Sequence, residues 1–501
     1  PYTTLFRSSD IQVPNNINSF LWGQYVVPTE GGVWQKSSWQ NIRNINYFMT
    51  HYQSVQAAEA DVNIYVAEMR FFRALEYFNK IQLLGDVPWL EVDLNVDSEE
   101  LYGPKMKRNQ VFQKIIEDLD FAIQWLPEAG SEEANRLNKD IARHVKARFC
   151  LNEGTHYKYH DELEYASEAE KWLQMAATES DKLITSGRYE IYNTGHPQED
   201  YFNMYRIDDK SDLKEAVLYV DYKTNIREHN MAAAGREAGC GFSKSFVESF
   251  LCSDGLPISL SNKYLGDETM RKETANRDPR LKQLILTNDF PTNVTDDLKD
   301  STFVVNEDEF ITQHCFTGYR PIKGFNPIYS QALYMKSSFD GIAYRYAETL
   351  LINAEAKAEL NTITNADLDR TVNQLRDRVG MPHLTVNVGF TDPKWPDWGY
   401  SLSPVLQEIR RERCIELAGE GFRFNDLKRW KAGKLLNNVL TYVGKRKPDG
   451  NLAIVYPNYT NPDLSYQAGK SRTWEDKMYL YPIPTGELQR NPQLLPQNPG
   501  W

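Results

Sequence analysis

The chain has 501 residues, of which 41% are hydrophobic and 25% charged, so it has the make-up of an ordinary globular protein and wholesale disorder is excluded. Its 57 Lys and Arg against 69 Asp and Glu leave a formal net charge of −12, and a field of that sign repels phosphate backbones and argues against nucleic acid as a partner. The longest uncharged run, residues 11–29, contains two prolines and several amides and cannot enter a membrane core.

The first part of the chain carries the pattern of long amphipathic helices. Apolar side chains recur at three- and four-residue steps, and Ala67, Phe71 and Phe78 share one stripe that Gly85 and Pro88 end. Four helices are expected, over residues 55–84, 109–126, 139–152 and 162–186. Alanines within the stripes let neighbouring helices approach closely, as in stacked helix pairs of the tetratricopeptide type. We therefore predict an all-α dominated fold on a tetratricopeptide-like helical repeat scaffold, although the strict residue signature of that repeat is absent.

The composition changes between residues 189 and 340, where helical periodicity fades and Gly, Pro, Asn, Asp and Thr become frequent. Two short strands are expected in this span, at 216–222 and 302–305. We interpret it as a loop-rich, mostly irregular subdomain laid over the helical scaffold. Loops held by rigid helices often carry binding residues.

Helical periodicity returns at Tyr344 as a helical hairpin, followed by a loop over residues 381–404 and a further helix from Pro404. The tail from Tyr479 to Trp501 is rich in Pro and Asn and is expected to run extended over the surface. The chain thus divides into an N-terminal helical repeat region, a loop-rich variable subdomain and a C-terminal helical region with the tail, at 1–188, 189–340 and 341–501. We expect the three regions to form one compact unit.

Cysteine and histidine give no metal or disulfide motif. The five cysteines form no Cys-x-x-Cys pair, and Cys150 and Cys414 lie in helical patterns that suit buried free thiols. His156 and His160 are four residues apart and would share a helix face, but Tyr157 stands where the zinc-protease pattern has Glu. No third ligand is evident, so a polar surface turn is the preferred interpretation, and no metal or cofactor is expected.

The densest charge run is Arg410–Arg413, with Glu416 and Glu420 behind it. Such a run could bind an anion or supply a carboxylate pair, but its helical spacing favours an ion-pair network with a structural role. The sequence has no Gly-x-Ser-x-Gly elbow, phosphate loop or dinucleotide fingerprint. No catalytic residue is predicted, while a glycosidase pair of carboxylates stays open because no two acidic residues stand out.

Aromatic residues make up 12% of the chain, and four of them lie in loops among polar neighbours: Trp89, Trp395, Trp398 and Tyr400. A pyranose ring has an apolar face of C–H groups that a flat indole or phenol can cover, while polar side chains at the rim bind the hydroxyls. We therefore take these four residues as candidates for ligand binding. Packing within the protein is the alternative interpretation for each of them.

Several segments, read together and in order, resemble the SusD/RagB family of nutrient-binding proteins. They are Glu68–Phe78 with Leu84–Pro88, Asp254–Gly255 with Arg277–Leu281, Arg345–Leu351 with Ala354–Ala356, Ile409–Leu417 with Gly421–Trp430, and Tyr479–Pro484 with Asn491–Pro492 and Gln497–Gly500. These segments span nearly the whole chain, and their combination is far more specific than any one alone. One departure is Gly419, where the family often has an aromatic residue.

The resemblance implies a surface-exposed lipoprotein of the Bacteroidetes outer membrane, anchored through an N-terminal cysteine that this sequence does not include. In that family a tetratricopeptide scaffold packs against a SusC-like TonB-dependent transporter, and a loop-rich face captures glycans without covalent chemistry. Trp89 matches a region where relatives often place a stacking aromatic residue. The expected function is capture of an oligosaccharide or polysaccharide and its delivery to the transporter. A glycoside hydrolase on a helical scaffold and a helical-repeat adaptor that binds peptides or proteins are the alternatives.

Overall fold

The computed structural model describes residues 9–14, 18–133, 135–232, 239–454 and 472–501. Two compact units make up the chain, and each combines segments that are distant in sequence. Unit 1 comprises Pro1–Gly23 and Ser180–Trp474, and unit 2 comprises Gln24–Glu179 and Glu475–Trp501. This grouping differs from the three regions expected from the sequence, because the tail belongs with the N-terminal helices and most of the two later regions share one unit.

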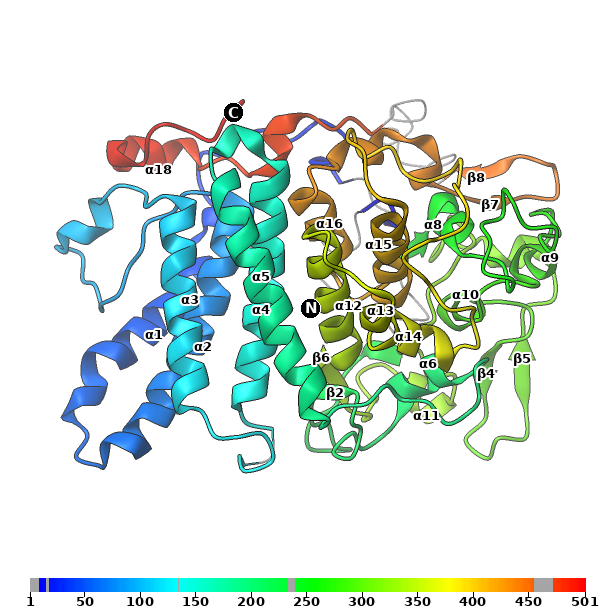
Figure 1. Ribbon diagram of the computed structural model, residues 1–501, viewed down its shortest axis with the longest axis horizontal. Coiled ribbons are helices and arrows are strands. Elements are labelled where there is room, and N and C mark those ends of the chain that lie inside the picture. Colours follow the sequence, from blue (N-terminus) through cyan, green and yellow to red (C-terminus); the bar gives the residue numbers. More distant parts are fainter. Residues whose placement is uncertain (1–8, 15–17, 134, 233–238, 455–471) are drawn as a thin grey trace. The chain divides into compact units, whose positions relative to one another are not determined.

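Unit 2 is a stack of consecutive helices, coloured blue to teal in Figure 1, together with the tail, which is red. The helices are α1 (Gln40–His51), α2 (Glu59–Leu84), α3 (Arg108–Trp125), α4 (Lys139–Tyr159), the greater part of α5 (Ala166–Ser186), and α18 (Thr485–Arg490) in the tail. Helix α2 packs against both α1 and α3, and α3 packs against α4. The stripe expected on α2 is buried, with Ala67 inaccessible and Phe71 and Phe78 at 1% and 4% exposure. The helix-dominated scaffold is therefore confirmed, and α1 is an element that the sequence analysis missed.

Helices α4 and α5 approach closely at a glycine. A Cβ atom at Gly154 of α4 would lie 2.9 Å from Cγ of Leu173 on α5, which is closer than packed carbon atoms can come. Phe112 of α3 and Trp172 of α5 also meet edge to face, with ring centroids 4.8 Å apart. Small residues at such contacts are what the sequence analysis expected of a stacked-helix scaffold.

The tail packs into unit 2, and the expectation that it runs extended over the surface is wrong. The Tyr481 amide donates to the Leu83 carbonyl (2.8 Å), and Asn498 Nδ2 donates to the Leu84 carbonyl (2.9 Å). These are carbonyls of the last turn of α2, which have no partners inside the helix. Tyr481 and Ile483 are buried at 5% and 0% exposure. The Pro and Asn content of the tail indicates irregular backbone, but it carries no information on burial.

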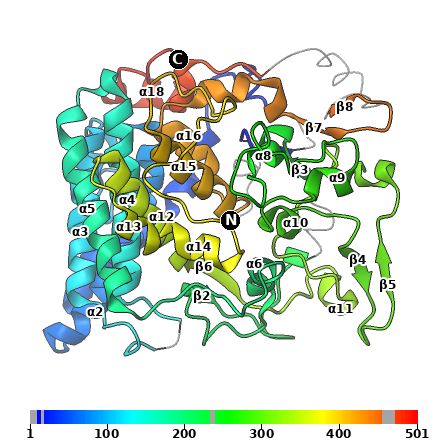
Figure 2. The ribbon, with the colours of Figure 1, turned by 45° about the vertical axis from the view of Figure 1, so that its right-hand side comes forward.

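Unit 1 holds, in the part of the chain that the structure describes, four antiparallel pairs of short strands. The pairs are β1 (Gln12–Pro14) with β3 (Cys240–Phe242), β2 (Ala216–Val220) with β6 (Gly341–Arg345), β4 (Pro291–Val294) with β5 (Ser301–Phe303), and β7 (Val443–Arg446) with β8 (Leu452–Ile454). The two strands expected from the sequence are present as β2 and β5. The β4–β5 and β7–β8 pairs stand at the edge of this unit in both views (Figures 1 and 2).

The helices of unit 1 surround an aromatic core. The longer ones are α12 (Tyr346–Glu359), α14 (Val372–Arg378), α15 (Pro404–Glu416) and α16 (Arg423–Arg429), and the shorter ones are α6 (Asp200–Asn203), α8 (Lys244–Ser249), α9 (Met270–Thr274), α10 (Arg280–Leu284), α11 (Tyr329–Ala332) and α13 (Asn365–Asp369). Helix α12 packs against α14 and α15. Helix α15 begins at Pro404 as expected, because Ser403 caps it and the fixed backbone angle of proline suits the first turn. Every described helix is either too short or too polar for a transmembrane span.

The charged residues of α15 form ion pairs within the protein, which is the structural role that their spacing favoured. The Glu416 carboxylate is fully buried and lies 2.6 Å from both Arg378 and Arg345 and 3.0 Å from Arg280. Burial alone would raise the pKa of Glu416, but these three guanidinium groups hold it well below its ordinary value. The partners lie on other elements of unit 1, so the run joins α15 to its neighbours instead of forming a ladder along one helix.

Candidate functional site

The loop that carries Trp89 follows α2 and is fixed by two helices of unit 2. The Tyr77 hydroxyl of α2 donates to the Leu90 carbonyl (3.1 Å) and accepts from the Leu90 amide (2.7 Å). Asn46 Nδ2 of α1 donates to the same carbonyl (3.0 Å), and the Asp93 amide donates to a threonine hydroxyl of α1 (3.0 Å). Loop backbone that is bound to side chains of packed helices is pre-organised, which lowers the entropy lost when a ligand binds.

The Trp89 ring is half-buried and lies among an aromatic ring and two cations. Its centroid is 4.1 Å from that of Tyr77, and the Arg73 guanidinium and the Lys114 ammonium lie 5.2 and 5.4 Å from it. Arg73 also makes a forked pair with a carboxylate of α3, and Lys114 lies 3.2 Å from Glu91. Burial would raise the pKa of Glu91, but the nearby Trp89 indole and Lys114 bring it below its ordinary value. The ring is thus held in one orientation from below, as a stacking platform requires.

Two buried acceptors at this loop have no hydrogen-bond partner among the described groups. They are the side-chain oxygens Oδ1 of Asn46, which anchors the loop, and of Asp93, which lies on it. The Trp89 N–H lies near Glu91 without the geometry of a hydrogen bond. Because an unpaired buried donor or acceptor costs about 1–3 kcal/mol, native proteins contain few of them. Two such acceptors on one loop match a ligand rich in hydroxyl groups, since a hydroxyl both donates and accepts.

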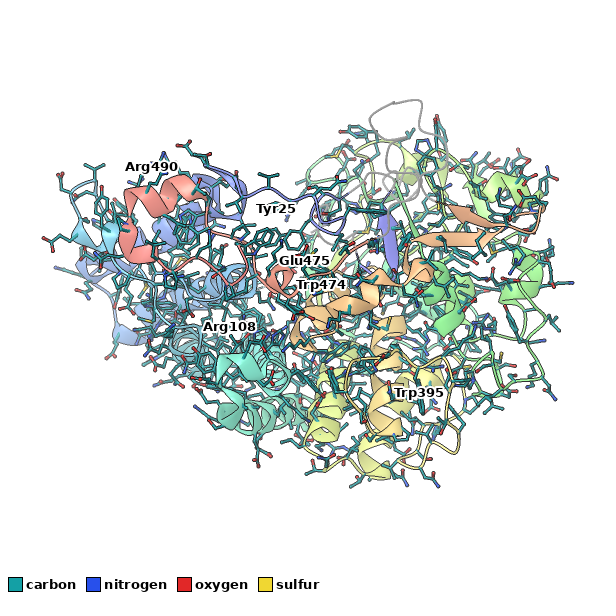
Figure 3. All side chains as sticks on the ribbon, turned by 90° about the horizontal axis from the view of Figure 1, so that it is seen from above. Tyr25, Arg108, Trp395, Trp474, Glu475 and Arg490 are labelled. Carbon is teal, nitrogen blue, oxygen red and sulfur yellow. The ribbon has the colours of Figure 1, made fainter. Side chains whose placement is uncertain are left out.

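Trp395 lies in unit 1, on the loop between α14 and α15, and is labelled in Figure 3. Its ring is half-buried, and its indole N–H donates to Glu408 Oε1 (2.7 Å). Glu408 is itself 1% exposed, and burial raises the pKa of its carboxyl. Arg411 lies 3.3 Å from the same oxygen, while Oε2 has no partner among the described groups. Trp395 therefore offers part of a ring, with its polar edge already bonded to the protein.

Trp398 and Tyr400 serve packing in unit 1, so the structure does not support them as exposed platforms. Trp398 is 6% exposed, its N–H donates to Gln407 (2.6 Å), and its ring meets that of Trp430 edge to face at 5.4 Å. The Tyr400 hydroxyl donates to the Trp430 carbonyl (2.6 Å) and accepts from Arg410 (3.1 Å). Burial raises the pKa of Tyr400 to about 12. A loop rich in Pro, Asp and Gly suggested exposure, but its aromatic side chains turn inward.

Of the four candidates, Trp89 belongs to unit 2 and the other three belong to unit 1. The sequence analysis missed Asn46 of α1, which bonds to the Trp89 loop, and the pair of Trp39 and Lys80, in which the Lys80 ammonium lies 4.5 Å from the Trp39 ring centroid. Trp39 and Asn46 were not identified because the segment around α1 shows few apolar residues. Lys80 carries a signal that could have been found, since it is a lysine beside the buried stripe of α2.

The two histidines that are four residues apart in sequence are buried in unit 2. His156 and His160 lie at the end of α4 and are 6% and 2% exposed, so the expected polar surface turn is wrong. Their rings are 4.0 Å apart, and His160 Nδ1 lies 3.0 Å from a glutamate oxygen. Among the described residues, no three His, Cys, Asp or Glu side chains are arranged to hold a metal ion. Cys150 and Cys414 are buried and form no disulfide, as expected.

Comparison with known proteins identifies relatives over most of the chain. The model of the SusD family matches residues 184–501. SusD-like protein P2 of Formosa agariphila is 25% identical over 456 residues, which cover 88% of this chain and 75% of that protein.

Solved structures share the fold. A SusD-like protein from Bacteroides fragilis superposes with a TM-score of 0.75 at 23% identity, covering 99% of this chain and 93% of that one. A SusD-like carbohydrate binding protein from the same species gives a TM-score of 0.71 at 21% identity, covering 98% and 92%.

Proposed function

Because the chain belongs to the SusD family, as its motifs predicted, we propose that it binds glycans and does not cleave them. The observation that carries the proposal is the half-buried Trp89 ring, which packs against Tyr77 on a loop that also carries unpartnered acceptors among the described groups. Stacking on the ring would supply affinity, and the polar atoms would orient the sugar hydroxyls. A relative of the same fold is described as a carbohydrate binding protein, which supports this assignment.

We further propose that the protein acts at the outer surface of the outer membrane, held there by a lipid anchor, and delivers its glycan to a SusC-like TonB-dependent transporter. Membership of the family supports this role. A glycan that must be passed on has to dissociate, so we expect moderate affinity. We expect an affinity-tagged copy of the protein to recover the transporter from detergent-solubilised outer membranes. Membranes that lack the tagged copy should yield no transporter in the same purification.

The binding proposal is tested by calorimetry and affinity electrophoresis against a panel of polysaccharides. Trp89→Ala should weaken binding about tenfold or more, since loss of a stacked ring costs about 1.5 kcal/mol. Trp89→Phe, which keeps a smaller ring, should lose less. Tyr334→Ala is the matched control, because it removes a ring that is 77% exposed and lies in unit 1. Equal affinities for wild type and Trp89→Ala, with both proteins folded, would contradict the assignment.

Hydrolysis of glycans is the second candidate function, and the structure offers Glu408 as a candidate catalytic acid. Burial raises the pKa of Glu408, and its carboxyl lies beside the half-buried Trp395 ring. A raised pKa and a neighbouring aromatic ring are both found at the acid residue of a glycosidase. Incubation of the protein with a bound oligosaccharide decides between the two functions. We expect no new reducing ends; sustained release that Glu408→Gln abolishes would establish an enzyme instead. Binding of peptides with no glycan affinity would support the adaptor.

A further inference from the structure

Lys80 of α2 is a buried lysine without a partner. It is 4% exposed, yet its ammonium forms no ion pair and no hydrogen bond with any group in the described ranges. The ammonium lies 4.5 Å from the ring centroid of Trp39. Lys146, the other buried lysine of unit 2, is also 4% exposed but lies 2.5 Å from Asp120. Buried lysines are almost always paired, so Lys80 is the exception that calls for a ligand.

The nearest carboxylate does not neutralise Lys80. Glu76 lies one turn earlier on α2, but it makes no ion pair with the lysine, and its Oε1 accepts from Asn41 Nδ2 (2.7 Å). Glu76 is the one charged group that acts on Lys80 across the described residues, and burial still lowers the pKa of the lysine to about 8. At neutral pH the site therefore keeps a positive charge that forms no ion pair with a described side chain.

Trp39 adds a second unsatisfied donor at the same place. Its indole N–H is buried without a partner, and the ring meets Trp34 edge to face at 5.1 Å. Both tryptophans are only half-buried, so the ammonium lies directly beneath a ring that solvent reaches. A cation and an N–H with no acceptor nearby suit an anionic group, and the rings suit the apolar face of a sugar.

This place and the Trp89 loop are both attached to α2. Tyr77 and Lys80 are three residues apart and lie on the same face of that helix, with a rise of about 4.5 Å between them. The Trp89 ring packs against Tyr77, and the Lys80 ammonium lies 4.5 Å from the Trp39 ring centroid. Arg73 and Lys114 also lie beside Trp89, where each of them pairs with a carboxylate.

We propose that this face of unit 2 takes an acidic glycan, whose carboxylate or sulfate group pairs with Lys80 while sugar rings stack on Trp39 and Trp89. The inference rests on the proposed function and adds the substrate class to it. Carboxylate and sulfate share the chemistry that an ammonium recognises, so the two sources are separated by experiment.

The test is calorimetry with three probes: oligogalacturonate, its methyl ester, and a sulfated galactan oligosaccharide. Lys80→Met removes the charge and keeps the chain length, while Lys171→Met removes the charge of an exposed lysine on α5 that has no part in the proposed site. We expect wild type to bind oligogalacturonate or the sulfated probe more tightly than the ester. Lys80→Met should weaken binding of that acidic probe about tenfold or more and leave the ester unchanged, whereas Lys171→Met should change binding less than about threefold.

The outcomes separate the inference from the proposed function. Binding of the ester or another neutral glycan without preference for either acidic probe overturns the acidic class and leaves glycan binding intact. An unchanged affinity of folded Lys80→Met for the preferred acidic probe removes Lys80 from the site. Absence of binding to every glycan overturns both proposals. A thermal transition of Lys80→Met at or above that of wild type shows that lost binding does not come from unfolding.

Discussion

Replacing Lys80 with methionine should stabilise the protein at neutral pH, although it removes a charged side chain from a helix. Methionine and lysine have similar helix propensities and similar lengths, so α2 itself should be unaffected. Burial lowers the pKa of Lys80 from 10.5 to about 8. At about 1.4 kcal/mol for each pKa unit, the folded protein bears a cost of roughly 3 kcal/mol to keep this lysine charged at pH 7.

The sign of the effect fixes its pH dependence. Because the folded pKa lies below the unfolded one, the unfolded state binds the proton more tightly, and the destabilisation is fully present below about pH 8. It declines as the pH rises from 8 towards 10.5, where both states are becoming neutral. Lys80→Met should therefore be more stable than wild type by up to about 3 kcal/mol at pH 7, with the difference vanishing near pH 10.5.

The assay is chemical denaturation of both proteins at several pH values between 7 and 10.5. Lys146→Met is the matched control, because this lysine is equally buried but pairs with Asp120, and its loss should destabilise by about 1 kcal/mol or more. A Lys80→Met protein that is less stable than wild type at pH 7, or a difference that does not change with pH, would refute the reasoning that Lys80 is an uncompensated charge.

Three further predictions test the packing around the sites. Glu416→Gln should lower the free energy of unfolding by roughly 3–5 kcal/mol in chemical denaturation, because it leaves three buried guanidinium groups without their carboxylate. Glu420→Gln, at a partly exposed position, should lower it less. Equal losses in the two variants would contradict the ion-pair network. Tyr77→Phe should lower the free energy of unfolding by about 1–2 kcal/mol, since the Leu90 amide loses its acceptor. It should also weaken glycan binding although the Trp89 ring is retained. Unchanged binding in calorimetry would show that anchoring of the loop is unimportant. Trp398→Ala should destabilise by about 3–5 kcal/mol, as expected of a buried ring, and the folded fraction should bind glycan as wild type does; selective loss of binding would return Trp398 to the site.

Amphipathic periodicity predicted much of the helical scaffold. The stripe of α2 and its end at Gly85 follow from local sequence, because Gly85 takes the left-handed backbone angle (φ 74°) that glycine favours. Helix α1 was missed because only Ile42, Ile45 and Asn46 are buried along its length. Burial on such a polar helix is decided by the neighbouring α2, which no local window contains.

From the sequence, a candidate site residue could be predicted only where one residue type in one loop was enough to suggest ligand binding. Trp89 stays a prediction that rests on its position after Pro88. Trp398 is buried, and loop composition does not show which way a side chain points. Lys80 and Trp39 are 41 residues apart in sequence, and their contact depends on how α1 packs against α2. Sites assembled across helices lie beyond what spacing along the chain can show.

Saturation-transfer NMR tests most directly whether rings of this protein hold carbohydrate intact. Irradiation of the aromatic protons should transfer saturation to the C–H protons on one face of a bound oligosaccharide. The transfer should fall sharply in Trp89→Ala and persist in Tyr334→Ala, with the sugar spectrum unchanged over hours. Transfer that is equally strong in Trp89→Ala, or new reducing-end signals that accumulate during the measurement, would contradict the account.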